Sequence, residues 1–195
     1  MSWDERYSAK HYVYGTDPNG FLVENFAKLP KGKILCLAEG EGRNAVFLAQ
    51  QGYHVTAVDA SAVGLAKAAR LAQDQGVDVE FIHMDLNDFD LGSNEWEGIV
   101  SIFAHVPEPV RQKLLPRVVE ALKPGGVFLQ EAYIPKQLEY NTGGPSKINM
   151  MYSKEIMQTG LEGLTFERLQ ELERQIDEGT RHSGMAAVVQ VIAIK

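Results

Sequence analysis

The sequence predicts an α/β protein, a doubly wound sheet of seven strands that ends in an antiparallel hairpin. From Lys33 onward, short apolar runs alternate with longer segments of helical spacing. The apolar runs are nearly continuous, which is typical of parallel strands covered by helices on both faces. Beyond residue 160 this alternation gives way to two long stretches that flank a turn-rich one.

Local signals mark the ends of several elements. Asp17 or Asn19 is positioned to cap a short helix near the N-terminus. Ser61 is the expected N-cap of the helix over 61–76, and Gly76 its stop. Pro116 predicts a kink or a late start in the helix within 108–126. The expected strands of the alternating part are 33–38, 54–59, 79–85, 96–104 and 126–134, and its first helix is 43–52.

The last part of the chain is less regular. Residues 164–176 have mixed apolar spacing, so a helix competes with a strand there, whereas residues 185–195 are strongly β-branched. We favour two long strands that close the sheet as an antiparallel hairpin. Residues 135–151 show no periodicity, and a long irregular segment in a compact domain is commonly functional, often a lid.

Composition limits the class of protein. A chain of 195 residues suits a single domain, here an N-terminal cap segment (1–30) followed by a cofactor-binding core (31–195). The net charge of −7 and the absence of a Lys/Arg run argue against a nucleic-acid partner. The lone Cys36 excludes an internal disulfide and disfavours a cysteine-based zinc site, so we expect no metal.

The two ends of the chain bear on its location. The N-terminus is charged and aromatic, unlike a signal peptide. The most apolar stretch, "AAVVQVIAI", is far shorter than the roughly 20 residues of a membrane helix. We therefore expect a cytoplasmic protein without a membrane partner, whose oligomeric state the sequence leaves open.

The stretch "EGEGRN" that follows the first expected strand predicts a ligand site. Gly40 and Gly42 let backbone approach a bound molecule closely. The helix that begins near Arg43 offers free N–H groups and the positive end of its dipole. In a doubly wound sheet, ligands bind at this edge, the carboxyl ends of the strands. A tight turn without a ligand is the alternative.

Asp59 strengthens the prediction of a nucleotide. It ends the next strand, 19 residues after Gly40, where a carboxylate can accept hydrogen bonds from both ribose hydroxyls. A helix N-cap is the competing role. The loop also fits the G-x-G-x-x-[GA] pattern of dinucleotide sites, so NAD stays open from the loop alone. The chain has no second domain for a dehydrogenase substrate and no Tyr-x-x-x-Lys pair.

Four motifs in order resemble the class I S-adenosylmethionine (SAM) dependent methyltransferases: "LAEGEGRN", "VDAS", "HMDLNDF" and "LKPGGVFL". The N-terminal "WDERY" and "YVYGTDPNGFL" and the later "TGGP" are similar to small bacterial tellurite-resistance and thiopurine-type enzymes. The resemblance implies a Rossmann-like fold, SAM as cofactor with S-adenosylhomocysteine (SAH) as product, and a small-molecule methyl acceptor. This sequence departs from the family's usual Asp-x-Gly-x-Gly-x-Gly motif at two positions, with Cys36 in place of the Asp and Ala38 in place of the first Gly.

The resemblance also implies a set of SAM-contacting residues. Asp59 would bind the ribose diol and Asp85 the adenine amino group. Glu39 would contact the SAM ammonium, unless backbone carbonyls suffice, and Arg6 would meet the SAM carboxylate. The full set is Glu39, Gly40, Gly42, Arg43, Asn44, Asp59, Ala60, Ser61, Asp85, Leu86, Phe103, Arg6, Tyr7 and Tyr14.

Methyl transfer from a sulfonium is an in-line displacement, so the protein must mainly align the reactants and exclude water. A base is needed only when the acceptor arrives protonated. His105 is the expected catalytic residue because it follows the fourth strand, and His182 and His11 are the other candidates. The N-terminal aromatic residues would close over the sulfonium or staple the N-terminal helix to the core: Trp3, Tyr7, Tyr12 and Tyr14.

The expected function is SAM-dependent methyl transfer to a small molecule, either a thiol, a metalloid oxyanion or a small acid. A protein that binds SAM or a nucleotide without catalysis is the first alternative, because the strand acid and the first glycine of the motif are missing. An NAD-binding oxidoreductase is the second.

Overall fold

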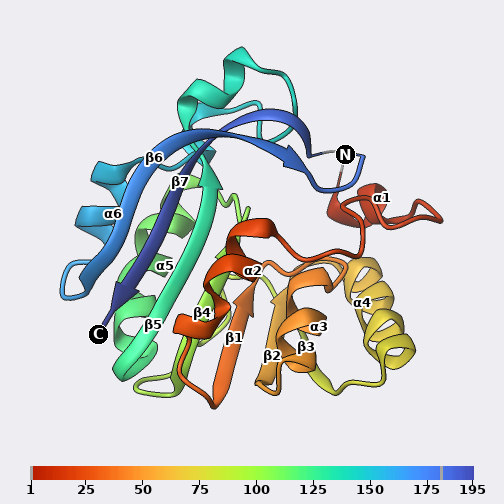
Figure 1. Cartoon of the computed structure of the whole chain (residues 1–195), viewed down its shortest axis with the longest axis horizontal. Coiled ribbons are helices and arrows are strands. Elements are labelled where there is room, and N and C mark those ends of the chain that lie inside the picture. Colours follow the sequence, from red (N-terminus) through yellow and green to blue (C-terminus); the bar gives the residue numbers. More distant parts are fainter. Residues whose placement is uncertain (1, 181) are drawn as a thin grey trace.

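Seven strands form one mixed sheet in the order β3-β2-β1-β4-β5-β7-β6 within the residues that the structure, a computed structural model, describes: 2–180 and 182–195. Strands β1 to β5 pair in parallel, and β7 runs antiparallel to both β5 and β6 (Figure 1). The predicted fold class is therefore confirmed. The strands are β1 (Lys33–Leu37), β2 (His54–Asp59), β3 (Val79–His83), β4 (Trp96–Ile102), β5 (Leu122–Tyr133), β6 (Thr165–Asp177) and β7 (Ser183–Ile194).

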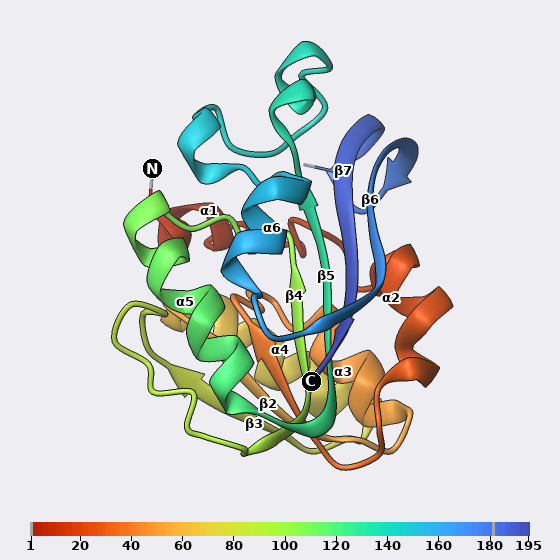
Figure 2. The ribbon, with the colours of Figure 1, turned by 90° about the vertical axis from the view of Figure 1, so that its left-hand side faces the viewer.

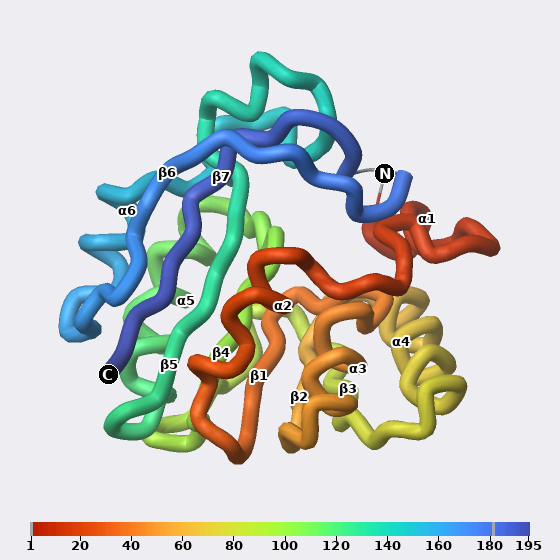
Figure 3. Tube along the Cα trace, viewed as in Figure 1, coloured from red at the N-terminus to blue at the C-terminus, as the bar shows by residue number. Residues whose placement is uncertain are grey.

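Helices cover both faces of this sheet, as the continuous apolar strands require. Helix α5 (Glu108–Ala121) and helix α6 (Lys154–Gly160) pack on one face, and α2 (Gly20–Asn25) and α3 (Arg43–Gln50) on the other (Figure 2). Helix α4 (Ala62–Gln75) packs beside α3. The short α1 (Trp3–Tyr7) lies against α4, close to the tip of the β6–β7 hairpin (Figure 3).

Most of the expected element ends are found. The Ser61 hydroxyl accepts from the Gly64 N–H, and Gly76 ends α4 in the left-handed conformation. Asn19, and not Asp17, caps α2, because its side chain accepts from the Leu22 N–H. Helix α5 begins at Glu108 and contains Pro116, so the expected late start is wrong, and the kink stays a prediction.

The end of the chain is the predicted antiparallel hairpin, and the competing helix over 164–176 is not formed. Residues 135–151 contain two short 3-10 turns, η2 (Pro135–Glu139) and η3 (Ile148–Met150). A third turn of this type, η1 (Phe26–Lys28), follows α2. Helix α6 was not predicted from the sequence, because its seven residues are too few to show a helical period, although Ser153 caps it.

Candidate functional site

The candidate residues meet at the carboxyl edge of the sheet, where the strand order reverses between β1 and β4. Ala38 follows β1 and Phe103 follows β4, and both adopt left-handed backbone, with φ of 50° and 52°. Such conformations are strained for residues other than glycine, at roughly 1–3 kcal/mol each, and they concentrate at functional sites. Two of them at the same edge of the sheet make this edge the candidate site.

Asp59 holds the glycine loop in place. Its Oδ2 accepts from the Gly40 N–H at 2.8 Å and its Oδ1 from the Ser61 N–H at 2.7 Å. The side chain is buried, and this burial raises the pKa of the carboxyl group. An ionised carboxylate has about four acceptor positions, so two remain for donors on a ligand. This donor and acceptor balance fits the diol of a ribose.

Glu39 lies at the N-terminus of α3. Its Oε1 accepts from the N–H groups of Asn44 at 2.9 Å and Ala45 at 2.7 Å, while its Oε2 has no partner among the described residues. Burial raises the pKa of Glu39 to about 7. The helix end is thus already occupied by a carboxyl group of the chain itself. A cation next to Oε2, such as the ammonium of SAM, would fit this arrangement.

The two glycines of the loop face different neighbours. A Cβ atom on Gly40 would collide with the Tyr7 hydroxyl and lie 3.0 Å from its Cζ. A Cβ atom on Gly42 would lie 2.6 Å from Ala68 Cβ and 2.9 Å from its Cα, in α4. Gly42 was expected to admit a ligand, but in this structure its missing side chain lets α3 pack on α4.

Residues 2–15 cover this loop. They are only the first part of the N-terminal segment (1–30), and from here on the name cap refers to residues 2–15 alone. The Asp4 carboxylate accepts from the Ser61 hydroxyl at 2.5 Å and from the Val63 N–H at 3.3 Å. The Tyr7 ring is buried, but its hydroxyl makes no hydrogen bond within the described residues. The Val13 N–H donates to Glu41 at 2.8 Å. The cap therefore covers the crevice and is also packed into the fold.

Four aromatic rings from four separate segments pack against one another, and we call them the aromatic box: Tyr14, Phe103, Tyr133 and His182. The His182 ring lies 4.6 Å from Tyr14, 4.7 Å from Phe103 and 5.4 Å from Tyr133, between ring centroids. His182 is buried, and its Nδ1 has no hydrogen-bond partner among residues 2–180 and 182–195. Burial, together with the positive Arg43, lowers the pKa of His182 well below its usual range, so its imidazole is neutral.

His105, the expected base, is held at both ring nitrogens. Its Nε2 accepts from the Tyr133 N–H at 3.2 Å, so its Nδ1 donates to the Met150 carbonyl at 2.9 Å. Burial lowers the pKa of His105 to about 4. Because neither nitrogen is free, the structure gives His105 the role of tying β5 to the 135–151 segment. His11 is exposed.

A buried charge network lies beside the aromatic box. The Arg43 guanidinium donates to Glu178 at 2.7 Å, and Arg174 Nε donates to Glu131 at 2.9 Å. Asn19 Nδ2 bridges the two carboxylates, at 2.9 and 2.8 Å. Arg43 was expected at the cofactor, but its charge is already matched inside the fold. The network consists of Asn19, Arg43, Glu131, Arg174, Glu178 and Gln190.

The remaining predicted residues lie around these centres. Asp85 is exposed and accepts from the Asn87 N–H, and Leu86 beside it is buried. The Ala60 carbonyl contacts His83 at 3.1 Å. Arg6 donates to the Tyr14 hydroxyl at 3.0 Å and lies over the Trp3 ring. The Asn44 side chain accepts from the Asn19 N–H at 2.9 Å.

Several residues of the site were not predicted from the sequence. Glu131 had a signal, because a carboxylate inside the apolar run "GVFLQEAYI" must find a buried partner. Glu178 and Arg174 had none, since the long β6–β7 hairpin brings them to this edge only after folding, and Tyr133 had none because its ring partners come from other segments.

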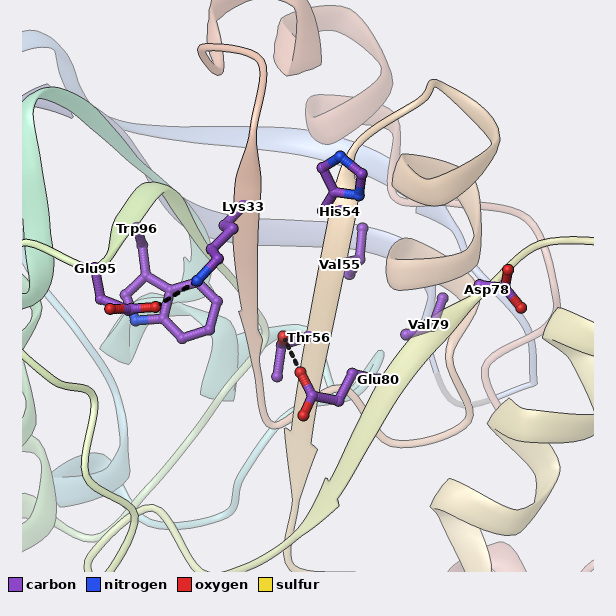
Figure 4. Close-up of a pocket in the computed structure, with 9 residues that line it drawn as sticks. All are labelled: Lys33, His54, Val55, Thr56, Asp78, Val79, Glu80, Glu95 and Trp96. Carbon is purple, nitrogen blue, oxygen red and sulfur yellow. Dashed lines mark hydrogen bonds and ion pairs between the residues drawn. The ribbon is translucent and has the colours of Figure 1, made fainter.

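A hollow of about 420 Å³ lies at the opposite edge of the sheet (Figure 4). It is lined by the amino ends of the strands, among them Lys33, His54 and Trp96. Two of its carboxylates have partners within it, as Lys33 donates to Glu95 and Thr56 to Glu80. It has no part in the site above.

Two further findings concern residues 2–180 and 182–195. They contain no cluster of three or more His, Cys, Asp or Glu side chains arranged to hold a metal ion. They also contain no helix with the length and apolar character needed to cross a membrane.

Residues 34–126 match the family model described as "Methyltransferase domain". The chain is 30% identical over 145 residues to a ubiquinone biosynthesis O-methyltransferase of Rickettsia canadensis, over 68% of this chain and 60% of that one. It is 34% identical over 108 residues to an uncharacterized methyltransferase of Synechocystis, over 54% of this chain and 49% of that one. The chain thus spans about half the length of these curated relatives.

A solved structure with a similar fold is TehB from Haemophilus influenzae, with a TM-score of 0.76 and 16% identity over 99% of this chain and 65% of that one. Another is described as converting a disulfide bond into a thioacetal group during echinomycin biosynthesis. It has a TM-score of 0.77 and 18% identity over 98% of this chain and 87% of that one.

Proposed function

We propose that this chain, whose residues 34–126 match a methyltransferase-domain family model, is a class I SAM-dependent methyltransferase that transfers a methyl group to a small-molecule acceptor. One observation carries the proposal: Asp59, at the end of β2, fixes the Gly40 loop and keeps acceptor positions free beside Glu39. Bound SAM supplies an activated methyl group. Asp59 would hold its ribose and Glu39 its ammonium, and the cap would exclude water from the crevice.

A small acceptor fits what surrounds the crevice. The cap lies over the Gly40 loop and is bonded to Ser61 and Glu41, and the net charge of −7 disfavours nucleic acid. Two curated relatives are named as a ubiquinone biosynthesis O-methyltransferase and a demethylmenaquinone methyltransferase, which supports a small-molecule acceptor. The absence of a membrane partner and a cytoplasmic location remain part of this proposal.

Calorimetry with SAM, SAH and NADH tests the cofactor. We expect SAM and SAH to bind and NADH not to bind. Asp59→Ala should weaken SAM binding by roughly ten- to several-hundredfold, because two charge-assisted hydrogen bonds contribute roughly 1.5–3 kcal/mol each before losses. Asp88→Ala, an exposed carboxylate beyond β3, is the matched control. Unchanged SAM affinity in folded Asp59→Ala would remove Asp59 from the site.

Binding without turnover is the second candidate, and the buried Cys36 at the position of the usual strand acid favours it. A screen for methyl transfer from SAM to thiols, small acids, amines and metalloid oxyanions separates the two. Turnover with any of these acceptors supports the enzyme. SAM binding without turnover across the screen supports the binding protein.

A further inference from the structure

Lys67, in α4, is a largely buried cation that joins the cap to the glycine loop. Its side chain is 17% exposed and forms an ion pair with Glu41, whose side chain is 2% exposed. Its Nζ also donates to three carbonyls of the cap, those of Tyr7 at 3.3 Å, Ala9 at 3.0 Å and His11 at 2.7 Å. Lysine is rarely buried without a partner, and here four acceptors surround its three N–H groups.

Glu41 holds the same segment from the loop side. It lies between the two loop glycines, and its Oε2 accepts from the N–H of Val13 at 2.8 Å and of Tyr14 at 3.4 Å. Its Oε1 is the partner of Lys67. Residues 8–14 form no helix or strand, so their backbone is fixed mainly by this one ion pair.

The segment held in this way begins with Tyr7, whose ring fills a slot between two glycines. A Cβ atom on Gly64, in α4, would lie 2.9 Å from Tyr7 Cδ2, and one on Gly40 would collide with the Tyr7 hydroxyl. Gly64 does not need a positive φ, and glycine weakens a helix relative to alanine. Its missing side chain therefore serves the close packing of the Tyr7 ring against the Gly40 loop.

The Tyr7 hydroxyl lies over the cofactor loop and is available to a ligand. It makes no hydrogen bond within residues 2–180 and 182–195, although the ring is only 6% exposed. Burial, with the Asp59 carboxylate nearby, raises the pKa of Tyr7, so the hydroxyl keeps its proton. A protonated hydroxyl at this place can donate to an oxygen of a molecule lying on the loop.

We propose that Lys67 and Glu41 are positioning residues for the cofactor: their ion pair holds residues 7–14 so that the Tyr7 hydroxyl donates to an oxygen of SAM on the Gly40 loop. This inference rests on the proposed function and deepens it at the same site. Both charged side chains are bonded to the cap and to each other, so they act on SAM through Tyr7. A staple that only stabilises the fold is the competing explanation, and it requires no link between the ion pair and the hydroxyl.

A double-mutant cycle on SAH affinity tests this link. Tyr7→Phe removes the hydroxyl and keeps the ring in its slot, and Lys67→Met removes the ammonium and keeps an apolar chain of similar length. Calorimetry should show that Tyr7→Phe weakens SAH binding about tenfold, the effect of one hydrogen bond. Lys67→Met should also bind SAH about tenfold more weakly. Adding Tyr7→Phe to it should matter less than twofold, because the hydroxyl is no longer held over the loop.

Lys31→Met is the matched control. Lys31 also donates to a backbone carbonyl, that of Gln51 at 2.7 Å, and its Nζ lies 4.1 Å from the centroid of the Tyr53 ring. It precedes β1 and so lies at the opposite edge of the sheet. We expect Lys31→Met to bind SAH like the wild type, and Tyr7→Phe to cost the full tenfold in that background.

A second background keeps the cycle available if Lys67→Met does not fold, since that change leaves the buried Glu41 carboxylate without its partner. Lys67→Met/Glu41→Gln leaves no buried charge, and the amide oxygen can still accept from the N–H groups of Val13 and Tyr14. Tyr7→Phe should again change SAH affinity less than twofold, because the three cap carbonyls have lost their common donor.

The outcomes separate this proposal from the proposed function. If Tyr7→Phe costs the same factor with and without Lys67, or if Lys67→Met binds SAH as tightly as the wild type, the ion pair is a staple and the proposal is overturned. Unchanged SAH affinity in Tyr7→Phe would overturn it as well, because the hydroxyl would not touch the cofactor. Failure of the wild-type chain to bind SAM or SAH would instead overturn the proposed function.

Discussion

At the scale of single residues, the glycine loop shows how two similar positions do different work. Gly40 faces the hydroxyl end of the buried Tyr7 ring, and Gly42 faces the Cβ and Cα of Ala68 in α4. Both have positive φ, of 62° and 90°. The sequence could place both glycines in a loop, but it could not tell them apart, because Tyr7 and Ala68 lie far from them along the chain.

This difference can be measured. Gly40→Ala and Gly42→Ala each force a left-handed alanine, at roughly 1–2 kcal/mol. Gly42→Ala also presses α3 against α4, which should lower the free energy of unfolding by roughly 1–3 kcal/mol more. Urea denaturation compares the two. An equal fall in the free energy of unfolding for the two variants would show that α4 shifts to make room for the new Cβ at no energetic cost.

Glu39 gives the site a pH dependence. Its folded pKa of about 7 lies above its ordinary 4.5, so the folded state holds the extra proton between these values. The free energy of unfolding should therefore fall as pH rises from about 4.5 to 7. A bound cation favours the ionised form, so SAM affinity should rise with pH up to about 7.

Glu39→Gln is the matched variant, because its amide oxygen still accepts from the N–H groups of Asn44 and Ala45. We expect SAM affinity in this variant to be lower and level with pH. Calorimetry in two buffers of different protonation enthalpy should show proton release on SAM binding by the wild type below pH 7. A wild type that releases no proton would refute this role of Glu39.

At the scale of elements, the charge network fastens the β6–β7 hairpin to α3 and α2. Glu178→Ala leaves the buried Arg43 guanidinium without its carboxylate, and loss of one partner of a buried pair typically costs 3–5 kcal/mol. Urea denaturation should show that the free energy of unfolding falls by about 3–5 kcal/mol. Glu167→Ala, in an exposed pair with Lys28, should change stability by about 0–1 kcal/mol. If Glu178→Ala lowers the free energy of unfolding by no more than Glu167→Ala does, water takes the place of the Glu178 carboxylate beside Arg43.

The elements also show what sequence can predict. Strands, helix caps and the Asp59 position follow from neighbours within a few residues, as with Ser61 and Gly64. The network joins Asn19 to Glu178 across 159 positions, and the aromatic box gathers rings from four segments. Contacts between residues so far apart in the chain depend on the order of the strands in the sheet, which a local sequence pattern does not contain. For the same reason, the sequence could not show that both ring nitrogens of His105 are hydrogen-bonded to backbone groups.

At the scale of the whole molecule, the cap and the 135–151 segment flank the crevice from two sides. If both close over the cofactor, amide hydrogen exchange in residues 2–15 and 135–151 should slow when SAH is added, because bound contacts offset the entropy of an open segment. The interior strands β1 and β4 should barely change. Deletion of residues 1–14 should lower SAM affinity and leave a folded core.

The opposite result is informative, because Asp4 and Val13 are already bonded to the core. Full protection of residues 2–15 without ligand, together with a sharp fall in melting temperature on deletion, would make the cap a fixed part of the fold. Cofactor entry would then depend on the 135–151 segment alone.

The order of the strands in the sheet has a consequence for the nascent chain during synthesis. Strand β7 is synthesised after β6, yet it lies between β5 and β6. While the ribosome is still adding β7, the edge of β5 that β7 will cover has no neighbour. A stalled or clipped product lacking β7 would keep the SAM-facing half and expose an unpaired apolar strand. Such a product is a natural target for chaperones and proteases.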